Sequence, residues 1–271
     1  MNQDSGKEIL KRIKAALEAA VETFSSFMLS SLTIEFKAGD DPVTEADRTV
    51  NRVLYQILKR DDEGWLSEES FDDSERLKKE RIWVVDPLDG TREFVAGIPE
   101  WCISVGYVEN GKAVAGGVCN PSTKELFLGA VDQGITLNGK VVSTRTSSDL
   151  TGAVILASRS EVKRGEWDCY KQASFITRPM GSVAYKLALV AAGLADATWT
   201  LTPKNEWDIA AGVALVECAG GIARKIDNFR LNFNQKTTRL PGLLACGPNL
   251  FEQVTSLLGQ GKSVSEEKPK S

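Results

Sequence analysis

The stretch Trp83-Val84-Val85-Asp86-Pro87-Leu88-Asp89-Gly90-Thr91 joins an apolar strand to two closely spaced carboxylates. Residues 82–85 have the β-branched and aromatic side chains that are typical of a buried strand. Proline has no N–H to donate to a sheet, so the pairing is expected to end at Pro87 and the chain to turn at Asp86. The stretch therefore predicts a buried strand that delivers its acids to one edge of a sheet.

The turn after this strand gathers polar groups. Gly90 can adopt a positive φ, which lets Asp86, Asp89 and Thr91 converge on one small volume. Two carboxylates that close repel each other unless a positive charge lies between them, and Mg²⁺ or Mn²⁺ prefers such oxygen ligands. A turn in which aspartates cap backbone N–H groups is the alternative for any single Asp-Gly pair.

The chain of 271 residues contains no histidine. This excludes Ser-His-Asp and Cys-His catalysis in their usual forms, the common zinc hydrolase sites and histidine as a general base. Carboxylates that bind hard metal ions are then the leading way to activate water near neutral pH.

The charge, the cysteine spacing and the hydropathy of the chain argue against nucleic acid, disulfides and a membrane anchor. A net charge of −4 with no lysine- or arginine-rich run gives no footprint for a nucleic-acid backbone. The five cysteines are widely spaced without a C-x-x-C pair, which favours reduced thiols and a cytoplasmic location over disulfides or a zinc site. No apolar run approaches the roughly 18–20 residues needed to span a bilayer, so neither a membrane anchor nor a signal peptide is expected.

Two helices are predicted in the N-terminal part. Ser5-Gly6-Lys7-Glu8 has the form of a capping box, and apolar residues follow it at helical spacing. A second helix begins after Thr44, with Asp47 in its first turn, where an acid also stabilises the helix dipole. Between the helices, a short strand at residues 32–37 and a turn at residues 39–42 are expected.

A further acidic pair follows a short strand that begins at Trp65. In Ser67-Glu68-Glu69-Ser70, successive side chains face opposite sides of the strand, so only one of Glu68 and Glu69 can join a site. The charged residues 72–81 are expected to form an exposed loop or a short helix.

The order of the elements predicts two lobes. A hairpin at Asn110-Gly111 and the strands around it indicate an antiparallel sheet, whereas the later part alternates strands with helices, as in layered α/β proteins. We place the boundary near residue 145. This gives a lobe of residues 1–145 that carries most candidate ligands, a lobe of residues 146–258, and a flexible tail of residues 259–271.

Asp208 stands at the predicted start of a helix in Trp207-Asp208-Ile209-Ala210-Ala211-Gly212. An acid at this position often caps the helix. The small residues Ala210, Ala211 and Gly212 instead allow this helix to approach another layer closely, which would press Asp208 against the central turn.

Four motifs together resemble the inositol monophosphatase superfamily of metal-dependent, lithium-sensitive phosphatases. They occur in the family's order within about residues 7–257, and they are Asp41-Pro42-Val43-Thr44-Glu45-Ala46-Asp47, Ser67-Glu68-Glu69-Ser70, Asp86-Pro87-Leu88-Asp89-Gly90-Thr91 and Trp207-Asp208-Ile209-Ala210-Ala211-Gly212. The resemblance implies the layered αβαβα sandwich of that family, an α/β (α+β) fold that often forms a homodimer.

The resemblance also implies roles for these residues. Mg²⁺ ions, two or three per active site, would be bound by Glu68, Asp86, the Leu88 carbonyl, Asp89 and Asp208. Thr91 with Asp47 would help to take the proton from the attacking water, near Glu68. Gly90 and Thr91 would offer backbone N–H groups to the phosphate, and Gly181-Ser182 would lie where the fold holds its substrate.

Electrostatics supports this assignment independently. The motif acids would carry four negative charges, and they are Glu68, Asp86, Asp89 and Asp208. A dianionic phosphate could therefore enter beside Asp208 only once divalent cations offset this charge. One cation would lower the pKa of the nucleophilic water and another would stabilise the leaving alkoxide, without a covalent enzyme intermediate.

Two other classes fit part of the pattern. The haloacid dehalogenase phosphatases also place an acid-rich turn and Gly-Thr after a strand, but their two acids are two residues apart, whereas Asp86 and Asp89 are three apart. A metal-binding or regulatory member that kept the fold without turnover is the non-enzymatic alternative.

The substrate is expected to be a small phosphorylated metabolite. Residues 86–94 and Glu206-Trp207-Asp208 look like the branch that removes the 3′-phosphate from 3′-phosphoadenosine 5′-phosphate, the 3′(2′),5′-bisphosphate nucleotidases. Inositol-preferring relatives carry a glutamate seven residues before the last motif aspartate, where this chain has Leu201. Inositol 1-phosphate is the alternative substrate.

Overall fold

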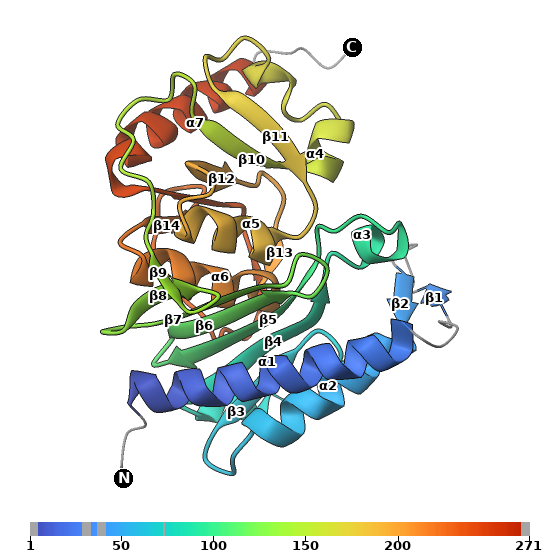
Figure 1. Ribbon diagram of the computed structural model, residues 1–271. Helices are drawn as coiled ribbons and strands as arrows, with labels where there is room; N and C mark the ends of the chain where they lie inside the picture. Colours follow the sequence, from blue (N-terminus) through green and yellow to red (C-terminus); the bar gives the residue numbers. More distant parts are fainter. Residues whose placement is uncertain (1–4, 29–33, 37–41, 73, 267–271) are drawn as a thin grey trace.

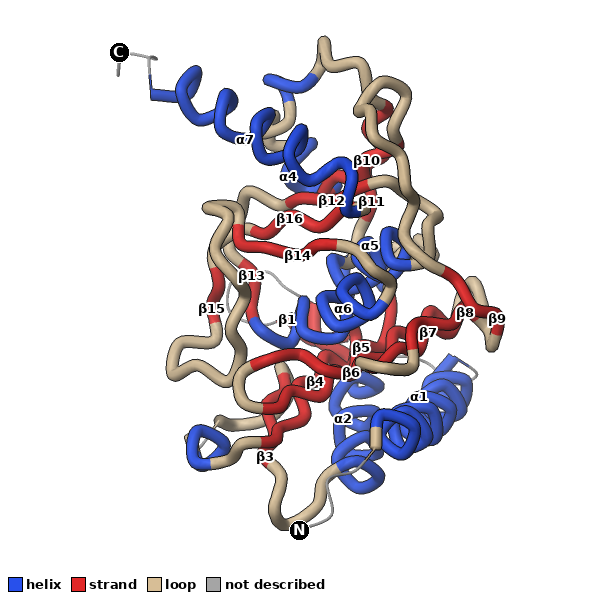
Figure 2. Tube along the Cα trace, turned by 90° about the vertical axis from the view of Figure 1, so that its left-hand side faces the viewer, coloured by secondary structure: helices blue, strands red, loops and turns tan. Residues whose placement is uncertain are grey.

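The computed structural model shows a sandwich of five alternating helix and sheet layers (Figure 1). Helices α1 (Gly6–Met28) and α2 (Glu45–Leu58) cover one face of a seven-stranded sheet. Helices α5 (Val183–Ala191) and α6 (Glu206–Cys218) lie between this sheet and a five-stranded sheet, and α7 (Phe251–Glu266) covers the outer face (Figure 2). The predicted αβαβα sandwich is confirmed. The structure describes residues 5–28, 34–36, 42–72 and 74–266.

The larger sheet is built almost entirely of antiparallel neighbours. In spatial order its strands are β3 (Gly64–Ser67), β4 (Arg81–Asp89), β5 (Cys102–Glu109), β6 (Lys112–Asn120), β7 (Glu125–Ala130), β8 (Gly134–Leu137) and β9 (Lys140–Val142). β3 runs parallel to β4, and the other neighbouring pairs are antiparallel. The predicted hairpin joins β5 to β6, and Asn110 and Gly111 have φ angles of 50° and 76°, which suit a type I′ turn.

The smaller sheet mixes parallel and antiparallel pairs. In spatial order its strands are β11 (Ile176–Met180), β10 (Val154–Ser158), β12 (Ala197–Trp199), β16 (Leu243–Cys246) and β14 (Ile222–Lys225). The first three are parallel, and β16 is antiparallel to both of its neighbours. Two short ribbons complete the strands, β1 (Ile34–Phe36) with β2 (Pro42–Thr44), and β13 (Lys204–Asn205) with β15 (Arg239–Leu240).

Apolar side chains fill the spaces between the layers in three clusters. The first joins α1 and α2 to the larger sheet and contains Trp83. The second packs α5 and α6 against both sheets. The third lies under α7 and contains Trp199, whose ring stacks on Trp167 with centroids 4.8 Å apart. Because the second cluster joins both sheets, the two halves share a core, and the expected division near residue 145 stays a prediction.

Helix α6 packs close to the larger sheet because glycines face it. A Cβ atom on Gly116 of β6 would lie 2.4 Å from the Ala211 carbonyl oxygen, and one on Gly106 of β5 would lie 2.9 Å from the Ala211 nitrogen. On the other side, a Cβ atom on Gly212 would lie 2.4 Å from the Leu187 Cβ of α5. The predicted close approach of this helix is confirmed.

The end of β4 differs from its prediction. The strand continues through Pro87 to Asp89, so the prediction that pairing ends at the proline is wrong. Asp86 pairs with Ser104 and Asp89 with Cys102, and the register shifts between these two pairs. The irregularity leaves Pro87 out of the ladder, so its missing N–H costs no hydrogen bond.

Two charged segments also differ from their predictions. Residues 72–81 contain the short 3₁₀ helix η1 (Glu75–Lys78), but Arg76 is buried, because its guanidinium forms an ion pair and hydrogen bonds inside the fold. The tail expected from residue 259 is helical as far as Glu266, since α7 continues to that residue. The expected turn at residues 39–42 lies largely outside the described residues, as do the ends of the strand at residues 32–37.

Helix α1 begins where the capping box predicts. The Glu8 N–H donates to the Ser5 hydroxyl at 3.3 Å. Further along, Arg12 forms an ion pair with Glu63 at 2.7 Å and lies 4.9 Å from the ring centre of Trp83, which holds α1 against the sheet. Among the described residues, no helix combines the length and the apolar character needed to cross a membrane.

A fully buried acid joins the short helix α4 (Arg159–Lys163) to the chain after β12. Glu161 is 0% exposed, and its carboxylate accepts hydrogen bonds from Thr200, Trp167 and Thr202. Burial raises the pKa of this carboxyl, but the hydrogen bonds outweigh burial and hold the pKa below its ordinary value of 4.5.

We expect Glu161→Gln to lower the free energy of unfolding by about 1–3 kcal/mol at neutral pH, because an amide cannot accept all of these bonds. Folding lowers the pKa, so this stabilisation is present above pH 4.5 and is lost as the pH falls through the folded-state pKa. Melting temperatures of the variant and the wild type should therefore converge in acid. The exposed Glu252→Gln is the control, and a difference that persists in acid would contradict this account.

Candidate active site

A cavity of about 280 Å³ opens where the ends of β4 and β10 meet the first turns of α5 and α6. The predicted site residues that line it are Glu68, Asp86, Leu88, Asp89, Gly90, Thr91, Gly181, Ser182 and Asp208. These residues come from both halves of the chain. The fold therefore brings the separated motifs to one place.

Asp47 is the predicted site residue that does not line this cavity. It lies in the first turn of α2 and is 2% exposed. Its negative charge nevertheless contributes to a raised pKa of Asp86. The charge of Asp47 thus affects Asp86, although Asp47 itself does not line the cavity.

The two adjacent glutamates lie in the turn after β3, so the prediction that they alternate along a strand is wrong. The Glu68 N–H donates to the Val85 carbonyl at 3.3 Å, and the Ser70 N–H donates to the Ser67 carbonyl at 3.4 Å. Glu68 lines the cavity and Glu69 does not, so only one of the two acids reaches it, through the turn.

Two acids of the cavity, Asp86 and Asp208, have raised pKa values. Burial raises the pKa of Asp86 well above its ordinary value of 3.8, and the negative charges of Glu68 and Asp89 add to this shift. The pKa of Asp208 is raised to about 8, first by burial and then by the charge of Asp89. This repulsion destabilises the ionised protein, and a cation in the cavity would relieve it.

In each of three of these carboxylates, one oxygen accepts hydrogen bonds from other groups of the protein. Asp86 Oδ1 accepts from the Leu88 N–H at 3.0 Å, Asp89 Oδ2 from the Ser182 hydroxyl and the Ala184 N–H at 2.7 Å each, and Asp208 Oδ2 from the Asn205 N–H at 2.8 Å. Within the described residues, no three Asp, Glu, Cys or His side chains are placed so that they could hold a metal ion as they stand. The donor set is nevertheless made of carboxylate and carbonyl oxygens, which are the ligands that a hard cation such as Mg²⁺ prefers.

Helix α6 begins two residues earlier than predicted. Its first residue is Glu206, Asn205 is the N-cap, and Asp208 is the third residue of the helix, in a capping box with Asn205. The N-cap is therefore Asn205 and not Asp208, whose carboxylate accepts the Asn205 N–H and also lines the cavity.

The turn after β4 places Thr91 beside the acids. Gly90 has a φ of 98°, as predicted, and a Cβ atom there would lie 2.9 Å from the Glu100 carbonyl oxygen. Thr91 opens the short helix α3 (Thr91–Val95), and its hydroxyl donates to the Leu88 carbonyl at 3.1 Å.

The turn before α5 is fixed from both sides. Ser182, with a φ of 45°, donates its hydroxyl to Asp89 and accepts the Tyr185 N–H at 3.0 Å as the N-cap of the helix. One turn later, Lys186 donates to the carbonyls of Gly181 and Ser182 at 3.2 and 3.1 Å. Burial lowers the pKa of Lys186 to about 8, although the charge of Asp89 opposes this shift.

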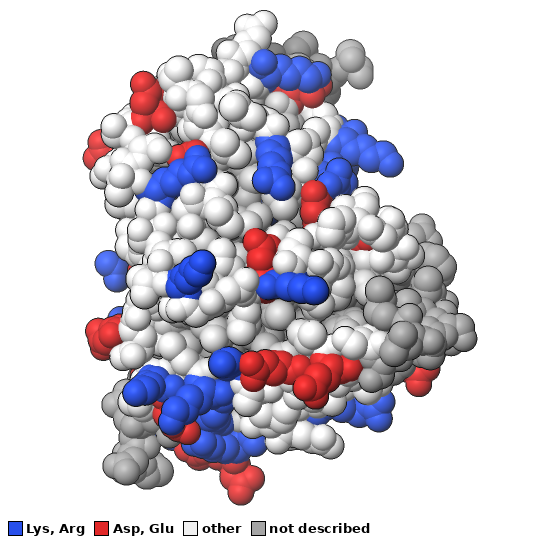
Figure 3. Space-filling model, viewed as in Figure 1, with Lys and Arg blue, Asp and Glu red and all other residues white. Residues whose placement is uncertain are grey.

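The cavity also contains polar side chains that the sequence did not single out. Arg159 and Lys204 line it together with the hydroxyls of Ser158 and Ser160. Arg159 Nε lies 3.7 Å from the carboxylate of Glu93, which lines the cavity too. Figure 3 shows acidic and basic side chains side by side on this view of the molecule. Arg159 could have been found from the sequence, because it follows a predicted strand and segments after strands of α/β sheets often bind ligands. No sequence pattern pointed to Lys204.

The five-layer fold and the acid-lined cavity together define a phosphatase of the metal-dependent class that the motifs resemble. Residues 6–260 match the model described as "Inositol monophosphatase family". This chain belongs to that family. It is a phosphoric monoester hydrolase, and its family is generally Mg²⁺-dependent.

Several known proteins resemble the chain over most of its length. The inositol-1-monophosphatase of Synechocystis sp. is 33% identical over 265 residues, which cover 91% of this chain and 92% of that protein. The fructose-1,6-bisphosphatase/inositol-1-monophosphatase of Thermotoga maritima is 34% identical over 70% of this chain and 73% of that protein. The solved structure of inositol monophosphatase from Anabaena (Nostoc) sp. has a TM-score of 0.76 and 27% identity, and the match covers 93% of this chain and 95% of that chain.

We expect Asp86→Asn to raise the melting temperature in chelator by about 2–4 °C at neutral pH, because the raised pKa of Asp86 makes folding either keep a repelled charge or take up a proton, and asparagine does neither. The asparagine Oδ1 can still accept the Leu88 N–H, so the turn is preserved. Differential scanning calorimetry measures the shift, with the exposed Asp61→Asn as the control. A fall in the melting temperature of Asp86→Asn would show that its charge stabilises the turn instead.

Proposed function

We propose that this phosphatase removes the 3′-phosphate from a 3′(2′),5′-bisphosphate nucleotide, converting 3′-phosphoadenosine 5′-phosphate to AMP. The observation that carries this proposal is the cationic part of the cavity, where Arg159 and Lys204 lie with the hydroxyls of Ser158 and Ser160. A bisphosphate offers a second anionic group to these side chains while its first phosphate faces the acids. Arg159 already pairs with Glu93 and Glu100, so Lys204 is the cation that we expect to make the main contact with this second group.

The position at which inositol-preferring relatives carry a glutamate does not bear on this choice. Leu201 is 37% exposed and does not line the cavity. Its lack of an acceptor for sugar hydroxyls therefore carries no weight, and the proposal rests on the cationic part of the cavity.

Inositol 1-phosphate is the second candidate substrate, and the relatives favour it. The Synechocystis protein is named an inositol-1-monophosphatase, and the name of the Thermotoga maritima protein includes both this activity and fructose-1,6-bisphosphatase. The second name shows that a bisphosphate and a polyol monophosphate occur as substrates of one relative.

The proposal assigns the metal site to the acids of the cavity. Two or three Mg²⁺ ions would be bound by Glu68, Asp86, the Leu88 carbonyl, Asp89 and Asp208. When bound, Mg²⁺ would acidify water and stabilise the developing charge on the leaving oxygen. A cytoplasmic location and a homodimer also belong to the proposal.

The other residues of the cavity would orient the substrate and handle the proton. Thr91, whose hydroxyl is held at the Leu88 carbonyl, would with Asp47 and Glu68 take the proton of the attacking water. The Gly90 and Thr91 N–H groups would contact the phosphate. The turn at Gly181-Ser182, which Lys186 holds in place, would contact the sugar.

With saturating Mg²⁺, we expect 3′-phosphoadenosine 5′-phosphate to be hydrolysed with a kcat/KM about tenfold or more above that of inositol 1-phosphate. Release of inorganic phosphate measures both rates. A preference for inositol 1-phosphate of tenfold or more would make the nucleotide assignment wrong and the polyol assignment right.

The cationic part of the cavity can be tested by a single substitution. We expect Lys204→Gln to lower kcat/KM for 3′-phosphoadenosine 5′-phosphate by about tenfold, because it removes a cation that contacts the second phosphate. The same variant should hydrolyse 3′-AMP, which lacks the 5′-phosphate, at close to the wild-type rate. Lys140→Gln, at an exposed lysine of β9, is the matched control. Equal losses on both substrates would show that Lys204 acts on the reacting phosphate.

A further inference from the structure

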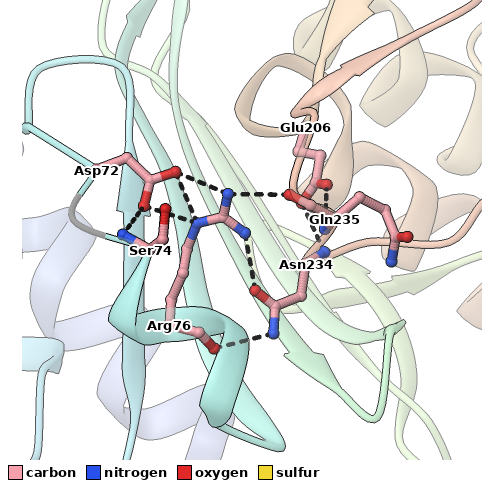
Figure 4. Close-up of polar contacts among 6 residues, drawn as sticks. All are labelled: Asp72, Ser74, Arg76, Glu206, Asn234 and Gln235. Carbon is pink, nitrogen blue, oxygen red and sulfur yellow. Dashed lines mark hydrogen bonds and ion pairs between the residues drawn. The ribbon is translucent and has the colours of Figure 1, made fainter.

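A buried arginine outside the cavity connects the segment after Glu68 to the segment before Asp208. The Arg76 side chain is 1% exposed and pairs with Asp72, with 2.7 Å between Nη2 and Oδ2. Its Nε also donates to both oxygens of Asp72 at 3.1 Å. Asp72 lies only four residues after Glu68, and its carboxylate is held by the Ser74 N–H at 3.0 Å (Figure 4).

The other donors of Arg76 reach across to a loop of the second half of the chain. Nη1 donates to the Asn234 side-chain oxygen at 2.8 Å, and Nη2 donates to the Gln235 carbonyl at 3.0 Å. Asn234 returns two hydrogen bonds through its amide, to the carbonyls of Arg76 and Lys79 at 3.1 and 3.2 Å. Asn234 has a φ of 60°, a left-handed conformation that asparagine adopts more readily than most residues.

The same loop holds the first residue of α6. The Asn234 N–H donates to Glu206 Oε2 at 2.7 Å, and the Gln235 N–H donates to Glu206 Oε1 at 2.8 Å (Figure 4). Glu206 is 0% exposed, and its own N–H donates to the Thr238 carbonyl at 2.9 Å. Both carboxylate oxygens of Glu206 are therefore fixed by backbone donors whose positions depend on Arg76.

Asp208 is two residues further along this first turn. Its Oδ2 accepts the Asn205 N–H, so the cap fixes the side chain to the helix start, while the start itself is fixed by Glu206. The chain of contacts from Arg76 through Asn234 and Glu206 to Asp208 spans the two lobes. It joins the backbone that carries Glu68 to the backbone that carries Asp208.

We propose that Arg76 and Glu206 are positioning residues that set the place of Asp208 relative to Glu68. Neither residue lines the cavity. The inference rests on the proposed role of Asp208 as a metal ligand. Partners that orient metal ligands typically change metal affinity by about 10- to 100-fold when they are removed.

The test uses Arg76→Gln and Glu206→Gln in the full chain, and its readout is the Mg²⁺ concentration that gives half of the Mg²⁺-induced rise in melting temperature. This readout needs no substrate, so it is independent of the choice between nucleotide and polyol. We expect the midpoint to rise about tenfold in both variants. Glu206→Gln keeps the size of the side chain but leaves one of the two N–H groups without an acceptor.

Arg12→Gln is the matched control, because Arg12 and Glu63 form an equally short buried ion pair whose members do not line the cavity. It should lower the melting temperature and leave the Mg²⁺ midpoint at its wild-type value. A wild-type midpoint in Glu206→Gln, or the same shift in Arg12→Gln as in the other two variants, would overturn the inference. If Arg76→Gln does not fold, Glu206→Gln decides the result alone.

Asp208→Asn, measured in the same way, separates this inference from the proposed function. If Asp208→Asn raises the midpoint while Glu206→Gln does not, the ligand assignment stands and the positioning role is wrong. If Asp208→Asn keeps the wild-type midpoint, Asp208 binds no Mg²⁺, and both its assignment as a ligand and the positioning role are wrong.

Discussion

Mutual repulsion among the acids of the cavity is the constraint on which the rest of this structure depends. Burial and the neighbouring negative charges raise the pKa of Asp86 and of Asp208. The fold tolerates this because fixed donors hold single oxygens, as the Ser182 hydroxyl and the Ala184 N–H do for Asp89. Folding thus brings acids together in the cavity at a cost in stability, which is the pattern expected of a functional site.

The layers of the sandwich explain how acids from distant segments meet. Glycines of the larger sheet, such as Gly116, let α6 lie so close that its first turn reaches the end of β4. The turn that carries Ser182 then joins α5 to the same place through Asp89. Packing of two helices between two sheets is therefore a condition for assembling the site, in addition to filling the core.

The basic side chains at the cavity occupy two kinds of position. Lys186 is buried and donates to backbone carbonyls, so its charge supports the turn before α5. Arg159 and Lys204 line the cavity with Lys186, and the proposed function assigns Lys204 to the part of the substrate beyond the reacting phosphate.

The sequence by itself determined the strand that carries Asp86, the positive φ of Gly90 and the N-terminal helices, because each depends on residues close together in the chain. The four motifs also indicated the layered fold, through their resemblance to a family. For Asp208 the sequence left two interpretations open, and the structure makes it the third residue of α6, on the cavity wall. Only the tertiary structure decided that Arg76 is buried, that β4 passes its proline, and that Lys204 lines the cavity. Those outcomes depend on partners contributed by distant segments, and periodicity and spacing carry no information about which distant groups will meet.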